Sequence, residues 1–335
     1  MNELALAVFA AARDAHATDG ESRTRRFASF EAAFDETSYL RELDRSGLRW
    51  LARSNPAFPA LLGSVHDPPP GLFLRGAAPA ELLSRPSVAI VGARSCTDYG
   101  AHVARIIGRE LAAAGAVVIS GLARGVDGWA HRGALDARGA TVAVLGCGVD
   151  RDYPAAHAEL ARRIAERGLI VSEYAPGVEP APWRFPARNR LVAGLAQATV
   201  VVEARERSGA LITADLALEE GREVFAVPGE ITSSLSAGSN RLLRNGATPL
   251  TAVVDVLEAF GIEPDAPEAP PALGEAAARV VERLAIEPSP ADALSRALDL
   301  DPGAVAAALT ELELAGAVSE RDGFFRLARP LGCPP

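Results

Sequence analysis

The sequence predicts an α/β protein whose centre is one parallel sheet. Six short, mostly branched apolar runs recur between Val88 and Val227, and such runs are typical of buried parallel strands. Segments with helical spacing of apolar residues separate these runs, and this alternation produces βαβ units. We therefore expect an extended Rossmann-like domain over residues 55–261, flanked by a small N-terminal helical domain and a C-terminal winged-helix-like domain.

The central domain needs each strand to be followed by a helix that returns the chain to the start of the sheet. The predicted strands are Val88–Val91, Val117–Ser120, Val142–Leu145, Leu169–Ser172, Val200–Val202 and Val224–Val227. The predicted helices are Tyr99–Ala114, Val126–Ala137, Ala155–Arg167, Asn189–Ala198, Leu211–Glu220 and a closing helix, Ala252–Phe260. Ligands of open α/β sheets bind outside the carboxyl ends of the strands, so we expect a site in the loops there.

The two flanking parts differ from the centre in their patterns. Residues 1–54 carry apolar residues scattered among charges, which predicts a small helical domain. Residues 262–272 are rich in proline and acid and predict an extended linker. In residues 273–335 we expect helices Glu275–Ala285, Ala291–Leu298 and Pro302–Ala315, with Asp301 as an N-cap, and a hairpin Val318–Leu327 turning at Asp322-Gly323.

Composition limits the classes of function. No apolar run is long enough to span a membrane and no signal peptide is evident, so we expect a cytoplasmic protein. The three cysteines are widely spaced and indicate neither a disulfide framework nor a zinc site. The net charge of −9 argues against a non-specific polycation, although a local basic site can still bind nucleic acid. All 34 basic residues are arginine, so every cationic contact is made by a guanidinium.

The stretch from Trp183 to Arg190 gathers positive charge and aromatic rings without any acid. It contains Arg184, Arg188 and Arg190, with Phe185 between the first two. Arginines beside aromatic residues are typical of single-stranded nucleic-acid binding, in which bases stack on rings and guanidinium groups bind phosphates. The alternative is a solvated basic turn. A second acid-free stretch contains Arg241 and Arg244.

Three other loops are candidates for anion binding. Ser208-Gly209 lies at a strand end and a helix start, where backbone N–H groups can meet an anion. Arg94 follows the first predicted strand, and Ser120-Gly121 follows the second, where glycine and serine can form a phosphate nest. The loop after the first strand, Gly92-Ala93-Arg94-Ser95, is neither a G-x-G-x-x-G fingerprint nor a P-loop, so neither NAD nor ATP is indicated.

Three sets of reactive side chains have a structural explanation beside the chemical one. Asp127 and His131 share a helix face and can form a metal or acid–base pair, but a helix-terminal Asp holding a His is favoured because a third ligand is not evident. Cys147 lacks a base partner, which favours a structural turn. Glu173 and Glu203 can be paired catalytic carboxylates, but a role in orienting arginines is favoured.

The tail argues against a further DNA-reading surface. Residues 272–335 contain six arginines and ten acidic residues, a net charge of −4. The helix that reads DNA in a winged-helix domain needs positive charge toward phosphate, whereas the predicted helix Pro302–Ala315 carries Glu311 and Glu313 and no base. We therefore expect this domain to bind a protein or to dock on its own chain.

The motifs taken together resemble one family closely. VAIVGAR, ISGLARGVDGWAH, TVAVLGCGVDRDYP, LIVSEY, FPARNRLVAGL, VVVEARERSGALITADLALEEGREVFAVPG and SAGSNRLLRNGA occur in this order. This resembles the bacterial DNA-processing protein A family (DprA, also called Smf) between about Asn55 and Phe260. The tail looks like the family's winged helix. Residues 1–54 occupy the place where the family often has a helical domain similar to a sterile alpha motif or to a helix-hairpin-helix.

The resemblance implies a cytoplasmic, non-enzymatic protein of natural transformation that takes no nucleotide cofactor. Such proteins bind and protect incoming single-stranded DNA, load the recombinase RecA onto it, and form homodimers through the Rossmann-like domain. Carried onto the matching motifs, the family's basic DNA pocket contains Arg94, Ser120, Gly121, Arg188, Asn189 and Arg190. Ser208 and Gly209 match a shared motif, and Arg184 is the candidate to replace a lysine that family members place near the pocket.

Two other classes of function compete with this prediction. Related Rossmann-like folds include nucleotide-monophosphate phosphoribohydrolases, which carry a P-G-G-x-G-T signature; Pro228-Gly229-Glu230 lacks its glycine run. Such an enzyme needs carboxylates, for which Glu173 and Glu203 are the candidates. The third class is an interaction scaffold, in which arginine substitutions in the pocket leave function intact.

Overall fold

The computed structural model of this protein describes residues 1–12, 20–261, 274–314, 317–321 and 323–327. The chain divides into two compact units, Met1–Pro264 and Asp265–Pro335. The linker predicted at 262–272 lies outside the described residues, as do Ala315 and Asp322 of the predicted tail elements.

The first unit is built on a nine-stranded sheet in the order β1-β2-β6-β5-β4-β3-β7-β8-β9. The seven strands β6-β5-β4-β3-β7-β8-β9 run parallel to one another, whereas β1 and β2 are antiparallel to their neighbours. The strands are β1 (Leu48–Ala52), β2 (Gly71–Arg75), β3 (Ser87–Val91), β4 (Val117–Ser120), β5 (Thr141–Val144), β6 (Leu169–Ser172), β7 (Ala198–Val201), β8 (Glu223–Ala226) and β9 (Thr248–Pro249). The order reverses next to β3, because the chain goes from β3 to β4 on one side and later returns to β7 on the other.

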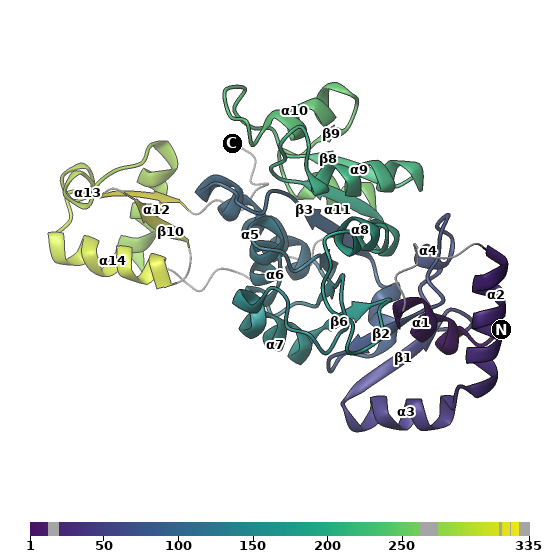
Figure 1. Cartoon of the computed structure of the whole chain (residues 1–335). Helices are drawn as coiled ribbons and strands as arrows, with labels where there is room; N and C mark the ends of the chain where they lie inside the picture. The colour runs from purple at the N-terminus through teal and green to yellow at the C-terminus, as the bar shows by residue number, and fades with distance from the viewer. Residues whose placement is uncertain (13–19, 262–273, 315–316, 322, 328–335) are drawn as a thin grey trace. The chain divides into compact units, whose positions relative to one another are not determined.

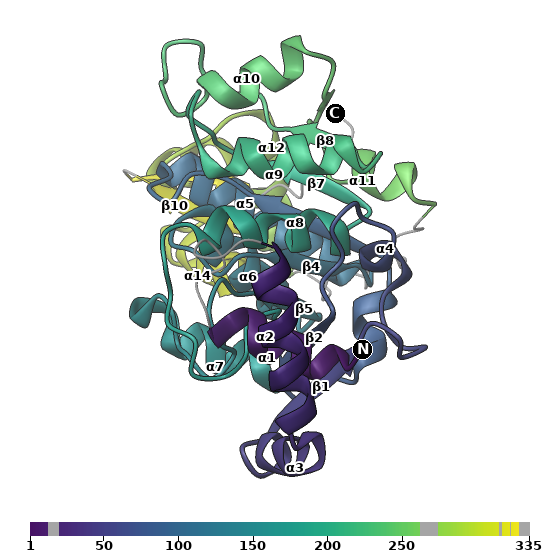
Figure 2. The same ribbon diagram turned by 45° about the vertical axis from the view of Figure 1, so that its right-hand side comes forward.

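Helices cover both faces of this sheet (Figures 1 and 2). Helices α4, α8 and α9 contribute to the core on one face, and α1, α3, α6 and α7 contribute to the core on the other. The helices of the first unit are α1 (Glu3–Ala12), α2 (Gly20–Ala33), α3 (Glu36–Arg45), α4 (Ala60–Gly63), α5 (Asp98–Ala113), α6 (Val126–Asp136), α7 (Ala158–Arg167), α8 (Arg184–Leu195), α9 (Gly209–Glu219), α10 (Ala237–Arg244) and α11 (Val254–Ala259), with short 3-10 turns η1 (Ala80–Ser84) and η2 (Ala155–His157).

The sheet separates the two cores, and successive side chains of a strand belong to the core on one face and then to the core on the other. In β5, Val142 and Val144 pack on the α8–α9 side, whereas Ala143 packs on the α6–α7 side. Successive side chains of a strand point to opposite faces, and here both faces are buried. This explains why the strands read as continuous apolar runs, and why the six predicted strands agree with the structure to within two residues.

The prediction that residues 1–54 are entirely helical is wrong at its end. Leu48–Ala52 forms β1, which pairs antiparallel with β2. Leu4 of α1 is buried in the same core as Leu160 and Ile164 of α7. The boundary expected after residue 54 therefore lies inside the first compact unit, and the sheet has strands that the sequence pattern did not reveal.

The second unit is a three-helix bundle with a hairpin, as expected for a winged helix. It contains α12 (Glu275–Ile286), α13 (Ala291–Leu298), α14 (Pro302–Leu314), β10 (Val318–Arg321) and β11 (Phe324–Leu327). The Asp301 carboxylate accepts the N–H groups of Gly303 at 2.9 Å and Ala304 at 3.3 Å, which confirms the predicted N-cap. Its core includes Val280, Leu294 and Leu312.

Candidate functional site

Two adjoining pockets lie at the carboxyl ends of the parallel strands. We call the first the switch-point pocket, because the loops after β3 and β7 line it where the strand order reverses; it is lined by Arg94, Asp127, Arg188, Asn189, Ser208 and Gly209, among others. We call the second the β5 pocket; it is lined by Gly121, Arg124, Gly146, Cys147, Tyr153 and Pro154, among others. Arg94, Ala123, Phe185 and Arg188 line both pockets, and we call the side chains of Arg94, Phe185 and Arg188 the wall between them.

Arg188 is the buried cation of this wall. Its residue is 4% exposed, and its guanidinium donates a hydrogen bond to the carbonyl oxygen of Val144 at the end of β5. A Cβ atom on Gly121 would overlap this guanidinium, so glycine at position 121 is what lets Arg188 lie against the loop. Burial lowers the pKa of Arg188, and the nearby Asp127 carboxylate opposes that shift. Arginine nevertheless stays protonated in proteins, so the charge is fixed in the pocket.

Asp127 is the buried anion beside it. Its carboxylate accepts the N–H groups of Gly121 at 3.1 Å and of Ala123 at 3.3 Å. Burial raises the pKa of Asp127, and the charges of Arg188 and Arg94 and these two N–H groups oppose the rise. The sequence predicted that Ser120-Gly121 offers its backbone N–H groups to a ligand phosphate. In the structure the N–H group of Gly121 already donates to the chain's own Asp127 carboxylate.

An aromatic pair stands beside the charges. The rings of Phe185 and Tyr153 stack with centroids 5.3 Å apart, and the Arg94 guanidinium lies 5.5 Å from the centre of the Phe185 ring. Arg94 is exposed, whereas Phe185 is half-buried. Tyr153 was not a candidate in the sequence, because its loop follows β5 at a distance and only the fold brings it to Phe185.

Three candidate residues turn away from the pockets. Ser120 is fully buried, and its hydroxyl donates to the carbonyl of Ile90 at 2.6 Å. Arg190 forms ion pairs with Glu173 and, at 3.2 Å, with Asp67. Arg184 donates to the carbonyl of Glu179 and lies over the Trp183 and Tyr174 rings. None of the three is among the residues that line the two pockets.

The remaining candidates meet in the switch-point pocket. The Asn189 amide donates to the carbonyl of Gly209 at 3.0 Å and so links α8 to the start of α9. Ser208 precedes α9 without capping it, and its hydroxyl oxygen is buried without a hydrogen-bond partner among the described residues. The structure thus brings together Arg94, Arg188, Asn189, Ser208 and Gly209, and it places Gly121 in the adjoining β5 pocket.

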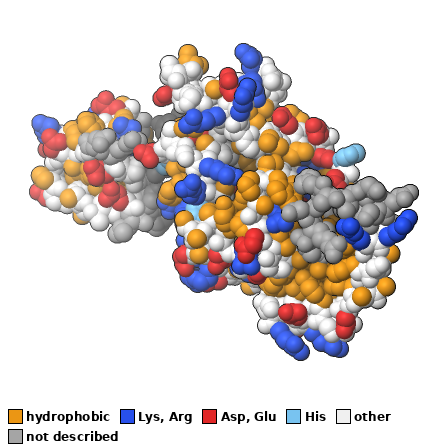
Figure 3. Space-filling model, viewed as in Figure 1, with side chains coloured by type: hydrophobic (Ala, Val, Ile, Leu, Met, Phe, Trp, Pro, Cys, Tyr) orange, Lys and Arg blue, Asp and Glu red, His pale blue; other side chains and the backbone are white. Residues whose placement is uncertain are grey.

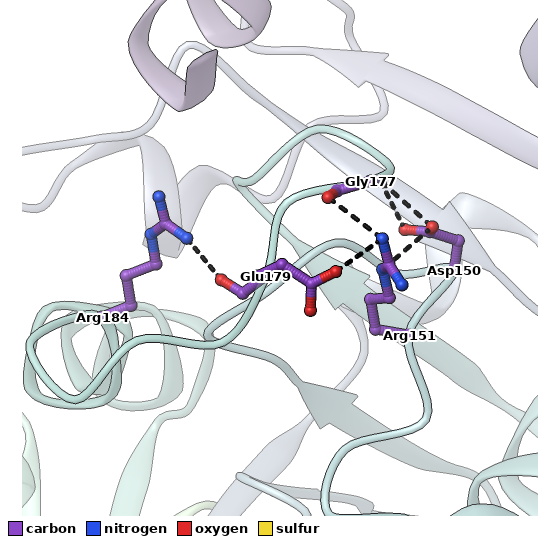
Figure 4. Close-up of polar contacts among 5 residues, drawn as sticks. All are labelled: Asp150, Arg151, Gly177, Glu179 and Arg184. Carbon is purple, nitrogen blue, oxygen red and sulfur yellow. Dashed lines mark hydrogen bonds and ion pairs between the residues drawn. The ribbon is translucent and has the colours of Figure 1, made fainter. Parts of the chain in front are cut away.

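A polar network fixes the loop that leads into α8 (Figure 4). The Asp150 carboxylate accepts the N–H of Gly177 at 2.9 Å, and Arg151 forms an ion pair with Glu179 at 2.8 Å. Arg184 binds the Glu179 carbonyl, so the first residue of α8 is tied to the same loop. These contacts hold the segment before Phe185 against the loop after β5, and they orient α8 towards the pockets.

The reactive side chains have structural partners. The Asp127–His131 pair is not formed: His131 bonds the Thr141 hydroxyl at 2.7 Å, and burial lowers the pKa of His131 to about 3. Burial also raises the pKa of Cys147 to about 11. Glu203 accepts from Thr97 at the start of α5, whereas Glu173 pairs with Arg190. The two glutamates therefore have separate partners, and of the two only Glu173 orients an arginine as expected.

On the face of the molecule shown in Figure 3, the described arginine side chains do not form one broad basic surface. In Figure 3 arginine side chains are scattered over the described part of the face shown, among acidic and hydrophobic ones. Among the described residues, no group of three His, Cys, Asp or Glu is placed to hold a metal ion. In the same residues, no helix is both long enough and apolar enough to cross a membrane.

Comparison with protein families identifies both units. Residues 49–261 match the model described as DNA recombination-mediator protein A, which covers more than half of the chain. The chain belongs to this family. Residues 264–323 match the DprA winged helix domain, in agreement with the helices and hairpin of the second unit.

Individual relatives support the same assignment. A putative DNA processing protein DprA of Mycobacterium tuberculosis is 45% identical over 266 residues, which cover 77% of this chain and 68% of that protein. The crystal structure of DprA from Streptococcus pneumoniae is similar with a TM-score of 0.64 and 39% identity, covering 69% of this chain and 80% of the other. A structure of DNA processing protein A from Helicobacter pylori, described for its single-stranded DNA binding mode, has a TM-score of 0.57 and 33% identity, covering 64% and 95%.

Proposed function

We propose that this chain is a recombination mediator that binds single-stranded DNA in the switch-point and β5 pockets. The observation that carries the proposal is the wall between the pockets, in which a buried guanidinium, an exposed guanidinium and an aromatic ring adjoin. Guanidinium groups suit backbone phosphates through their planar donor forks, and an aromatic face can stack any base. The relative from Helicobacter pylori, described for single-stranded DNA binding, supports it.

In this proposal each wall residue has its own task. Arg188 and Arg94 bind consecutive backbone phosphates, one from inside the wall and one from its exposed rim. The ring of Phe185, already stacked on Tyr153, supports a base. Asn189, Ser208 and Gly209 complete the side of the switch-point pocket that is formed by α9.

The wider role follows from family membership. We propose that the protein protects incoming DNA during natural transformation in the cytoplasm and loads RecA recombinase onto it. We further propose that it works as a homodimer joined through the first unit. DNA binding without catalysis suffices for this role. Neither Glu173 nor Glu203 is among the residues that line the two pockets.

The test is fluorescence anisotropy of a labelled single-stranded oligonucleotide across a salt series. We expect Arg94→Ala to weaken binding about tenfold and to reduce the salt slope by about one, because one phosphate contact releases about one counterion. Arg188→Gln should weaken binding further, since the amide keeps a donor for Val144 but removes the buried charge.

The matched controls are arginines that the structure places elsewhere. Arg162→Ala removes an exposed guanidinium paired with Glu159 and Glu166, and Arg190→Ala removes one paired with Glu173 and Asp67. Both should bind the oligonucleotide with an unchanged salt slope. The proposal fails if the wild-type protein does not bind, or if the control variants lose as much affinity as Arg94→Ala.

A further inference from the structure

The charges of the switch-point pocket do not balance at zero. Among the described residues that line it, two are guanidinium cations, Arg94 and Arg188, and one is a carboxylate, Asp127. Asp127 is only 7% exposed, and it lies in the field of both arginines. The pocket therefore presents a net charge of one positive unit, where two arginines alone would present two.

Asp127 also removes backbone hydrogen-bond donors from the loop that lines the two pockets. Loops at strand ends in this type of fold commonly present backbone N–H groups to a phosphate. Here the N–H groups of Gly121 and Ala123 donate to Asp127 instead. An incoming phosphate meets the side-chain donors of the arginines but not these two backbone donors.

Two other carboxylates make similar contacts outside the pockets. Glu203 accepts the N–H and hydroxyl of Thr97 at the start of α5, and Asp150 accepts the N–H of Gly177. Neither carboxylate lines the switch-point pocket. Asp127 thus differs from these two carboxylates because it lies in the same pocket as Arg94 and Arg188. Contact with backbone donors is common to all three carboxylates.

We propose that Asp127 is a specificity-determining residue that biases the pocket towards phosphodiesters inside a strand and against terminal phosphate monoesters, including those of free nucleotides. The inference rests on the proposed function, because it concerns how the same pocket selects its phosphate. A diester carries one negative charge, whereas a phosphate monoester carries nearly two above its second pKa of about 6.

The physical basis is the different growth of two energies with ligand charge. Attraction to the pocket grows in proportion to the charge, whereas the cost of removing water from an ion grows with its square. Reducing the pocket from two positive units to one therefore favours the singly charged ligand. A protein built in this way binds the interior of a strand and is not saturated by mononucleotides.

The test uses two small competitors that differ by one charge. Thymidine 5′-monophosphate and its methyl ester, a diester of the same nucleoside, compete with a labelled oligonucleotide at pH 8. For wild-type protein we expect the methyl ester to compete better, because removing water from its single charge costs less than removing water from the doubly charged monophosphate. Asp127→Asn should improve competition by the monophosphate roughly tenfold more than competition by the ester, because the gain scales with ligand charge.

Asp150→Asn is the matched control, since it also neutralises a carboxylate that accepts a backbone N–H in a neighbouring loop. It should leave the ratio of the two competitors unchanged. Equal competition in the wild-type protein, an unchanged ratio in Asp127→Asn, or an equal change in Asp150→Asn overturns the inference. Equal competition in the wild-type protein overturns the inference even if Asp127→Asn does not fold, whereas a failure to bind the labelled oligonucleotide itself rejects the proposed function instead.

Discussion

Arg188 is held in one position by the chain's own contacts. Its guanidinium has a carbonyl acceptor at Val144, lies against the bare backbone of Gly121, and is balanced by Asp127. A long side chain normally loses conformational entropy when it is immobilised at an interface. Because packing has already immobilised Arg188, little of that cost remains for DNA binding, whereas the exposed Arg94 still has to be ordered.

We expect the contribution of Phe185 to DNA binding to be independent of salt concentration. We expect Phe185→Leu to weaken binding of a single-stranded oligonucleotide by about 1 kcal/mol, because leucine keeps an apolar side chain but cannot stack a base. The salt slope should stay as in the wild type, since no charge is removed. Anisotropy titrations at two salt concentrations measure both quantities.

Trp183→Leu is the adjacent control for this prediction. The sequence left Trp183 and Phe185 as equal candidates for base stacking, but only Phe185 lines the pockets. An affinity loss in Trp183→Leu as large as that in Phe185→Leu would place the stacked base outside the wall.

At the scale of the element, the geometry of helix α8 determines which of its own arginines reach the pockets. Residues three or four apart share a helix face, whereas residues two apart do not. Phe185 and Arg188 are three apart and both line the wall, while Arg190 is two beyond Arg188 and turns to Glu173. The prediction that Arg188 and Arg190 bind one ligand together conflicts with this geometry.

The sequence missed this because the helix was predicted to begin only at Asn189. Helix α8 begins at Arg184, so Pro186 lies in its first turn, where a missing N–H costs nothing.

The parallel strands were predictable because burial on both faces makes them apolar throughout. Strand β1 was not predictable, because Leu48–Ala52 contains Arg49 and Trp50 and is not a continuous apolar run. It becomes a strand by pairing with β2, which lies later in the chain. Asp127's contact with Gly121 likewise depends on the loop conformation, which no spacing rule supplies.

Helix α6 is joined to the sheet by a buried histidine, and this contact predicts acid sensitivity. Thr141 donates its hydroxyl proton to Val118, so the His131 ring donates to Thr141 through Nδ1–H and is held neutral. Burial lowers the pKa of His131 to about 3. The neutral ring therefore contributes its full stability above the unfolded pKa of about 6.5, and this is lost as the pH falls towards 3.

We expect the wild-type protein to lose about 2 kcal/mol more unfolding free energy than His131→Asn between pH 7 and pH 4.5. Urea unfolding at the two pH values measures the difference. His66→Asn, which replaces an exposed histidine, should follow the wild-type pH dependence. A wild-type pH dependence in His131→Asn would show that another group controls acid stability.

At the scale of the whole molecule, charge is divided unevenly along an acidic chain. The net charge is −9, and residues 272–335 account for −4 of it. The arginines of the wall belong to the first compact unit, Met1–Pro264, which has its own cores on both sheet faces. The second unit has a separate core and an acidic composition, which suits a protein partner better than DNA.

This division predicts that the first unit alone binds single-stranded DNA. A fragment of residues 1–264 should bind a labelled oligonucleotide with the wild-type affinity or up to about threefold more tightly, because removing the acidic unit removes repulsion of the phosphates. Any gain should disappear at high salt, where charges farther apart than about 3 Å are screened at about 1 M. A fragment of residues 265–335 should not bind the oligonucleotide at all. Loss of most of the affinity in the 1–264 fragment would show that the winged-helix unit contacts the DNA, and that its arginines bind phosphate although the unit as a whole is acidic.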